Sequence, residues 1–72
     1  MEDIKLGIYK HYKGKEYRVL GIATHSETLE KMVVYQALYG TYGIWVRPIN
    51  MWNEVVEVNG QQVKRFEFIR EE

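Results

Sequence analysis

Residues 16–28 decide the fold of this chain, and they read Glu-Tyr-Arg-Val-Leu-Gly-Ile-Ala-Thr-His-Ser-Glu-Thr. We expect one long strand here, because β-branched, aromatic and aliphatic side chains dominate the run. A strand of about ten residues is long for a small domain. Gly21 lies near its middle, and a glycine inside a strand often marks a bulge or a sharp bend. We therefore predict that this strand coils around a small core.

The side chains of the expected strand belong to two faces. Val19 lies on one face, while Leu20 and Ile22 lie on the other, so both faces carry apolar groups. A bend at Gly21 that exchanges inside and outside would explain this pattern. We predict that the strand pairs with different neighbours in its two halves. We also predict that a Gly21→Val variant is destabilised by more than about 1 kcal/mol through backbone strain.

A hairpin is expected on the N-terminal side of this strand. Residues 6–13 are rich in aromatic and β-branched side chains, as in a strand. Gly14 and Lys15 fit a two-residue type II′ loop, in which the first residue has a positive φ. This register predicts two favourable cross-strand pairs, which are Lys13 with Glu16 and Tyr12 with Tyr17.

The segment from residue 29 to residue 39 has features of both a helix and a strand. Its apolar residues recur partly at helical spacing, and Ser26 or Thr28 is a suitable N-cap. Val33, Val34 and Tyr35 instead favour a strand, and a glycine follows the run. We predict a strand, and the helix stays open as the alternative.

The next strand is expected at residues 44–47, after a loop at residues 40–43 that contains two glycines. Pro48 cannot donate a hydrogen bond to a central ladder, so the strand ends there or lies at a sheet edge. Residues 49–52 are expected to form a turn or a short 3₁₀ segment.

The dipeptide Asn59-Gly60 predicts a type I′ hairpin, because both loop positions need a positive φ. Two-residue closure places Val56 opposite Val63. It also places Glu54 opposite Arg65. Phe66 and Phe68 then fall on the face opposite Val63, and a bulge near Arg65 would resolve this conflict.

The composition fits one small domain over residues 1–72. The chain has 72 residues, of which 46% are hydrophobic, and it has no cysteine that could form a disulfide or a thiolate site. We expect no signal peptide, and no apolar run approaches the roughly 20 residues that span a bilayer. A cytoplasmic location is therefore expected. Five or six short strands with tight hairpins favour a mainly all-β fold, a small, strongly bent Src-homology-3-like barrel.

Three runs of residues resemble a family of small bacterial domains of unknown function. They are G-x-Y-x-H-Y-K-G-x-x-Y-x-V-L-G-x-A-x-H-S-E-T at residues 7–28, V-V-Y-x-x-L-Y-G at 33–40 and W-V-R-P-x-x-M at 45–51. The resemblance covers roughly residues 7–68, and Trp52 stands where phenylalanine is expected. It implies a compact bacterial domain, and it implies no activity and no site residues.

The aromatic residues are the best candidates for a binding site. Trp45 and Arg47 share a strand face, and Tyr35 and Tyr39 share another. Rigid aromatic side chains and arginine are enriched at binding hot spots. The competing interpretation is that most of these aromatics pack in the core or at a barrel rim. We predict that Trp45, Arg47 and at least one of the two tyrosines line a shared, partly exposed cleft.

A second candidate set consists of His11, His25 and Glu27. Two imidazoles and a carboxylate suit a divalent metal, and Ser26 beside His25 also permits a Ser-His-Glu arrangement. Hydrogen bonds from these side chains to the backbone of a turn explain the same residues more simply. Metal-dependent chemistry is therefore the alternative and not the main prediction.

The expected function is a non-catalytic binding module with an aromatic groove and no cofactor. Its partner is expected to be a peptide, a protein or a small molecule. The ten basic and ten acidic residues give a net charge of zero, which argues against a nucleic-acid partner. No membrane partner is expected.

Overall fold

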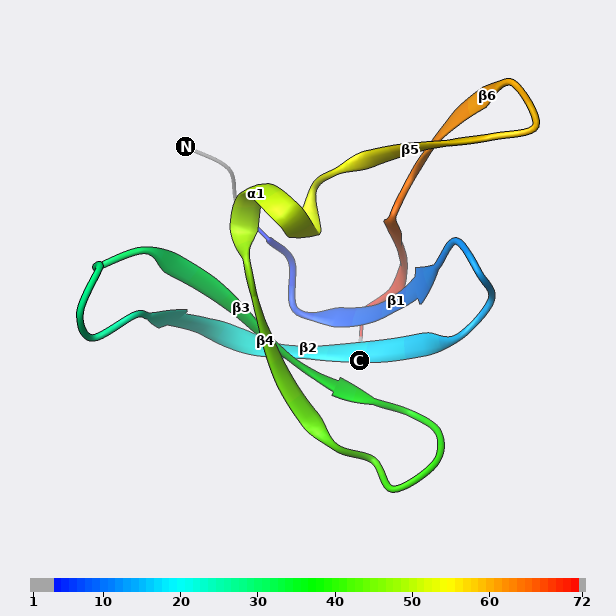
Figure 1. Ribbon diagram of the computed structural model, residues 1–72. Helices are drawn as coiled ribbons and strands as arrows, with labels where there is room; N and C mark the ends of the chain where they lie inside the picture. Colours follow the sequence, from blue (N-terminus) through cyan, green and yellow to red (C-terminus); the bar gives the residue numbers. More distant parts are fainter. Residues whose placement is uncertain (1–3, 72) are drawn as a thin grey trace.

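The computed structural model describes residues 4–71 of the chain (Figure 1). Seven strands and one helical turn follow one another in the order β1 (Gly7–His11), β2 (Glu16–Thr24), β3 (Lys31–Ala37), β4 (Ile44–Pro48), α1 (Ile49–Trp52), β5 (Val55–Val58), β6 (Gln61–Lys64) and β7 (Phe66–Arg70). Five strands form an antiparallel sheet in the order β4-β3-β2-β1-β7. The β5–β6 hairpin is a separate two-stranded sheet that extends away from the rest. The prediction of a mainly β fold is confirmed, with seven strands instead of five or six.

The long strand β2 exchanges its inside and outside faces near Gly21, as predicted. Its pairing with β3 shifts register between Val19 and Gly21, so Val19 lies opposite Tyr35 and Ile22 lies opposite Val33. Directly opposed residues share a face. The odd-numbered Val19 and the even-numbered Ile22 therefore lie on the same side of the sheet, because one extra residue in β2 exchanges the two faces. β3 pairs with β2 at residues 17–24, and β1 pairs only with residues 16–19.

The bulge lies next to Gly21 as predicted, but the backbone strain predicted for a side chain at this position is not present. The φ of Gly21 is not positive, and a Cβ added at this position would meet no atom within 4 Å. The bulge therefore bends the strand in a conformation that other residues can adopt, and backbone strain gives no reason for a Gly21→Val variant to lose stability.

The predicted register of the first hairpin is also wrong. Lys10 lies opposite Glu16, and Tyr9 lies opposite Tyr17. The His11 N–H donates to the Lys15 carbonyl at 2.7 Å, so the loop contains three residues instead of two. Gly14 closes this loop with a φ of 108°. A three-residue loop with a glycine at its last position is a common hairpin connection. Gly14 therefore occupies the last position of the observed loop, whereas the prediction placed it first.

The segment that was ambiguous between helix and strand is β3. Its residues alternate between buried and partly exposed, with Val33, Tyr35 and Ala37 buried on one face. This period of two is the mark of a strand. Pro48 ends β4, which is an edge of the sheet, as predicted. Residues 49–52 form one α-helical turn instead of a 3₁₀ segment.

The Asn59-Gly60 hairpin is confirmed in its loop and its register. Asn59 has a φ of 53° and Gly60 a φ of 82°. Val56 lies opposite Val63. The Arg65 N–H donates to the Glu54 carbonyl at 2.9 Å, and the Arg65 guanidinium pairs with the Glu54 carboxylate, also at 2.9 Å.

The predicted conflict, in which Phe66 and Phe68 fall on the face opposite Val63, is resolved at the junction between β6 and β7. β6 ends at Lys64 and belongs to the hairpin, whereas β7 begins at Phe66 and pairs with β1. The chain therefore changes sheets at Arg65, whose carbonyl accepts a hydrogen bond from the Tyr12 N–H at 2.9 Å. A change of sheet allows Phe66 to face the core without any bulge inside the hairpin.

The core is built around aromatic rings on one side of the five-stranded sheet. Its buried members are Tyr9, Val19, Val33, Tyr35, Trp52 and Phe66. The sheet curves so far that Arg47 of β4, at one end, lies over the ring of Phe66 of β7, at the other end. Within residues 4–71, β4 and β7 each pair on one side only, so the strand pairing does not show a closed barrel. No helix in this part of the chain is long and apolar enough to cross a membrane.

Candidate binding surface

Trp45 and Arg47 lie on the core side of the sheet, at its β4 edge. Trp45 is opposite Tyr35 and Arg47 is opposite Val33, and both of these β3 residues are buried. Trp45 itself is 60% exposed, because β4 is the last strand and no further strand covers it. The core therefore continues to the surface at this edge, and Trp45 is accessible there.

Arg47 is held beside Trp45 by an aromatic contact. Its guanidinium lies 5.5 Å from the centre of the Phe66 ring, a geometry that suits a cation–π interaction. Among residues 4–71 no carboxylate forms an ion pair with this guanidinium, and its Nε is buried without a hydrogen-bond partner. Arg47 is therefore a positioned cation with hydrogen-bonding capacity that the described residues do not use.

Two further tyrosines extend the aromatic groups away from β4. Tyr17 packs edge-on against Tyr35 with ring centroids 5.5 Å apart, and against Tyr39 with ring centroids also 5.5 Å apart. The hydroxyl groups of Tyr17 and Tyr39 are 2.6 Å apart and share a hydrogen bond. Lys15 places its ammonium group 5.0 Å from the centre of the Tyr39 ring. A cation therefore lies beside the aromatic groups at this end too.

We use the name aromatic surface for Tyr17, Tyr39, Trp45 and Arg47. The buried ring of Tyr35 packs against Tyr17 and lies opposite Trp45, so it connects these residues from the core side. Burial is the main cause that raises the pKa of Tyr17 to about 12, and the hydrogen bond between the Tyr17 and Tyr39 hydroxyl groups adds to it. The nearby charge of Arg47 acts in the opposite direction. Tyr17 is therefore a neutral phenol at ordinary pH, and the aromatic surface offers flat rings, hydroxyl groups and one guanidinium.

His11 lies at the far end of the same aromatic cluster and has a local structural role. Its Nδ1 accepts a hydrogen bond from the Lys13 N–H at 3.1 Å, inside the first hairpin loop. Its ring packs against Tyr12 and Phe66. Burial lowers the pKa of His11, and the positive charges of Arg65, Arg47 and Lys13 lower it further. The imidazole is therefore neutral at pH 7.

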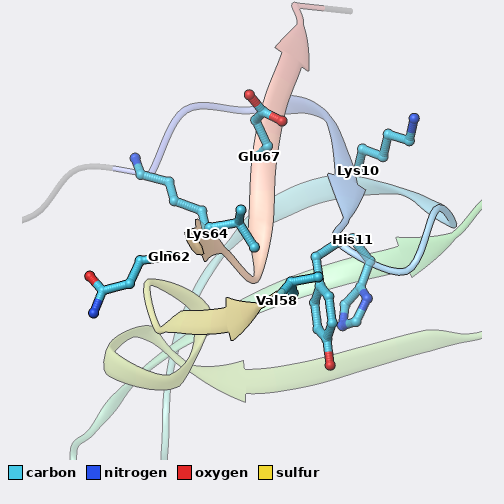
Figure 2. A pocket seen from close by; sticks show the side chains of 8 residues that line it. Lys10, His11, Val58, Gln62, Lys64 and Glu67 are labelled. Carbon is cyan, nitrogen blue, oxygen red and sulfur yellow. The ribbon is translucent and has the colours of Figure 1, made fainter. Parts of the chain in front are cut away.

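A hollow of about 510 Å³ lies beside His11, between the β5–β6 hairpin and the pair of strands β1 and β7. Figure 2 shows its polar side chains, and Lys10, Lys64 and Gln62 extend outward in different directions. Groups that act together on one reacting atom must converge on a point about 3 Å from each of them. The side chains around this hollow diverge instead, so the hollow is an open groove lined by solvated polar groups.

His25 and Glu27 lie at the opposite end of β2 from His11. The His25 Nδ1 accepts hydrogen bonds from the Glu27 N–H at 3.2 Å and from the Thr28 N–H at 3.3 Å. This confirms that the imidazole holds a turn. The nine residues of β2 span about 30 Å, so the structure separates His11 from His25 and Glu27, the other two members of the alternative metal set. In the described part of the chain no three His, Asp or Glu side chains are close enough to hold a metal ion.

The sequence prediction missed Tyr17 as a member of the aromatic surface and missed Lys15 as the cation beside Tyr39. Tyr17 was expected only as a cross-strand partner in the first hairpin, and Lys15 only as a loop residue. The pairing of β2 with β3 places Tyr17 opposite Ala37, on the face where Tyr35 is buried. The small side chain of Ala37 is a signal that was available in the sequence, since it leaves room for a ring on the neighbouring strand.

Comparison with known proteins agrees with the sequence resemblance. A family model described as "Protein of unknown function (DUF1653)" matches residues 7–68. A crystal structure of a DUF1653 protein from Bordetella bronchiseptica is similar over 99% of this chain and 94% of its own, with 38% sequence identity and a TM-score of 0.89. No curated protein matches the chain. The extent of the family match and the close structural similarity lead to one conclusion, that this chain belongs to the DUF1653 family.

Proposed function

We propose that this domain is a non-catalytic binding module and that the aromatic surface is its binding face. The observation that carries the proposal is the contrast between its two tryptophans. Trp52 is 1% exposed, whereas Trp45 is 60% exposed beside an arginine without an ion pair in residues 4–71. An exposed tryptophan next to arginine has the composition of an interface hot spot.

The geometry of the aromatic surface supports binding by stacking and by hydrogen bonding at once. The ring contact with Tyr35 and the shared hydroxyl hydrogen bond with Tyr39 fix the orientation of Tyr17. A partner therefore meets side chains that are already ordered, which lowers the entropy that binding costs. Arg47 adds a cation that can receive a carboxylate or a carbonyl oxygen.

The chemistry of this face favours a peptide, a protein or a small molecule as the partner. Ten basic and ten acidic residues leave the chain without the positive charge that drives binding to a phosphate backbone. A bacterial source and a cytoplasmic location remain predictions. Cell fractionation tests the location.

The test of this proposal is capture of partners by the immobilised domain, with a matched pair of variants. Trp45→Ala removes the exposed indole and should abolish capture while the far-ultraviolet spectrum stays that of the folded domain. Leu29→Ala is the control, because Leu29 is 70% exposed in the turn after β2, outside the aromatic surface. Capture that is equal in both variants would refute the proposal.

A further inference from the structure

Within residues 4–71, β4 pairs with β3 on one side and leaves its other edge free, and the hydrogen bonds to β3 show which backbone groups point out of this edge. The Ala37 N–H donates to the carbonyl of Gly43 at 2.9 Å, which continues the β3–β4 register one residue beyond the Gln36–Ile44 pair. Because bonded and non-bonded pairs alternate in an antiparallel ladder, Trp45 and Arg47 also bond inward to β3. The N–H and C=O groups of the residues between them therefore face away from the sheet. Val46 is at the centre of this free edge.

The free edge is short, and it is apolar on both faces. Ile44, Trp45 and Val46 are 61%, 60% and 57% exposed. Exposed strand edges of this kind usually carry a charged residue that prevents pairing with another chain. Here the first charge is Arg47, and Pro48 then occupies an outward-facing position where its missing N–H costs no bond to β3. These features define an edge that can pair over about five residues and no further.

We propose that β4 pairs antiparallel with β4 of a second copy of this chain, around a two-fold axis through Val46. This inference rests on the proposed function and names the partner of the aromatic surface. An axis at Val46 places each Trp45 directly opposite the partner's Arg47. The two Val46 residues exchange both of their outward backbone hydrogen bonds.

The self-complementary order Trp-Val-Arg is the reason for choosing a second copy over another partner. In the proposed ladder, Trp45 and the partner's Arg47 form a non-hydrogen-bonded pair, in which side chains approach most closely. The guanidinium that already lies on Phe66 can then receive an indole on its other side. The exchange is reciprocal, so each copy supplies one indole and one guanidinium. A net charge of zero also means that two copies do not repel each other.

The proposed assembly is a closed dimer and not a filament. A two-fold contact uses the same edge of both copies, so no second β4 edge remains to continue the assembly. The interface covers five residues on each side, which is small. We expect a dissociation constant on the order of 10–100 µM, because interfaces below about 1,200 Å² are typical of weak complexes.

Sedimentation of the full chain over a range of concentrations tests the dimer. The wild type should change from monomer to dimer as its concentration rises through about 10–100 µM. Trp45→Lys places a cation opposite the partner's Arg47 and should shift the dissociation constant upward at least tenfold. The double variant Trp45→Lys/Arg47→Glu restores opposite charges across the axis and should recover most of that loss. Circular dichroism establishes that all three proteins are folded.

Hydrogen exchange locates the interface independently of the variants. The Val46 amide should exchange fast at low concentration and become protected as the dimer forms. The Trp45 amide, which bonds to β3, should be protected at every concentration. A monomer at all concentrations overturns the dimer, and so does a dimer that Trp45→Lys leaves unchanged. If the monomer still captures a partner through Trp45, the dimer is refuted and the proposed binding function stands.

Discussion

The indole of Trp52 lies flat on the ring of Phe66, with centroids 3.8 Å apart and planes 2° apart. Trp52 is the last residue of α1, which directly follows β4 at one end of the sheet. Phe66 is the first residue of β7, at the other end of the sheet. The stack therefore connects the two ends of a bent sheet through side chains. The edge-on packing of Tyr9 against Trp52 places this contact at the centre of the core.

The two tryptophans should differ sharply in their contribution to stability. Trp52→Ala removes a buried indole and should lower the free energy of unfolding by about 3–5 kcal/mol. Trp45→Ala removes an exposed one and should change it by less than about 0.5 kcal/mol. Urea denaturation measures both values, and a loss above about 2 kcal/mol for Trp45→Ala would show that it belongs to the core.

Gly7 and Gly21 form a matched pair for testing which glycine the fold requires. Gly7 has a φ of 147°, and an added Cβ would lie 2.5 Å from the Arg70 carbonyl oxygen. Gly7→Ala should therefore destabilise the domain by about 2 kcal/mol or more, since strain and a backbone clash act together. Gly21→Ala, in open space, should stay within about 0.5 kcal/mol. Comparable losses in the two variants would contradict the assigned roles.

High pH should weaken the fold through Tyr17. The pKa of Tyr17 is about 12 in the folded state, so the fold retains a proton that the unfolded chain releases near the ordinary tyrosine pKa of 10.0. The stabilisation is complete below pH 10 and is lost as the pH rises toward 12. Tyr17→Phe should flatten this part of the pH–stability profile. Denaturation midpoints between pH 9 and 12 provide the measurement, and an equal slope in both proteins would refute it.

Low pH should weaken the fold through His11. Burial and neighbouring cations lower the pKa of His11 below the ordinary histidine value of 6.5, so the folded state resists protonation. This contribution is present above pH 6.5 and is lost as the pH falls through the folded pKa. His11→Asn keeps a side chain that can accept the Lys13 N–H and does not titrate. The wild type should lose more stability than this variant between pH 6.5 and 5.

Local sequence patterns predicted the elements that short-range chemistry controls. Asn59-Gly60 fixed its own hairpin because both residues tolerate a positive φ. The first hairpin was harder, because Gly14 satisfies a two-residue loop and a three-residue loop equally well. The register of this hairpin is then decided by packing. Tyr9 packs against Trp52 and Tyr17 packs against Phe66, and neither distant contact can be predicted from the local sequence.

Whether each aromatic residue is buried or exposed also depends on tertiary structure. Trp45 and Trp52 are seven positions apart in a mixed apolar segment, and their residue type does not separate them. Trp52 is buried because α1 turns it onto the core, whereas Trp45 is exposed because β4 ends the sheet. Strand order depends on contacts between distant parts of the chain. The composition therefore predicted that a candidate surface exists, but it did not predict which residues belong to it.

The change of sheet at Arg65 has a practical consequence for engineering this domain. The β5–β6 hairpin is attached at its base, where Arg65 holds Glu54 by a backbone hydrogen bond and an ion pair. Its tip at Asn59 and Gly60 is exposed and extends away from the five-stranded sheet. A peptide tag or a fluorescent reporter inserted there leaves both the core and the β4 edge intact, so the tip is a suitable insertion site for labelling the protein in living cells.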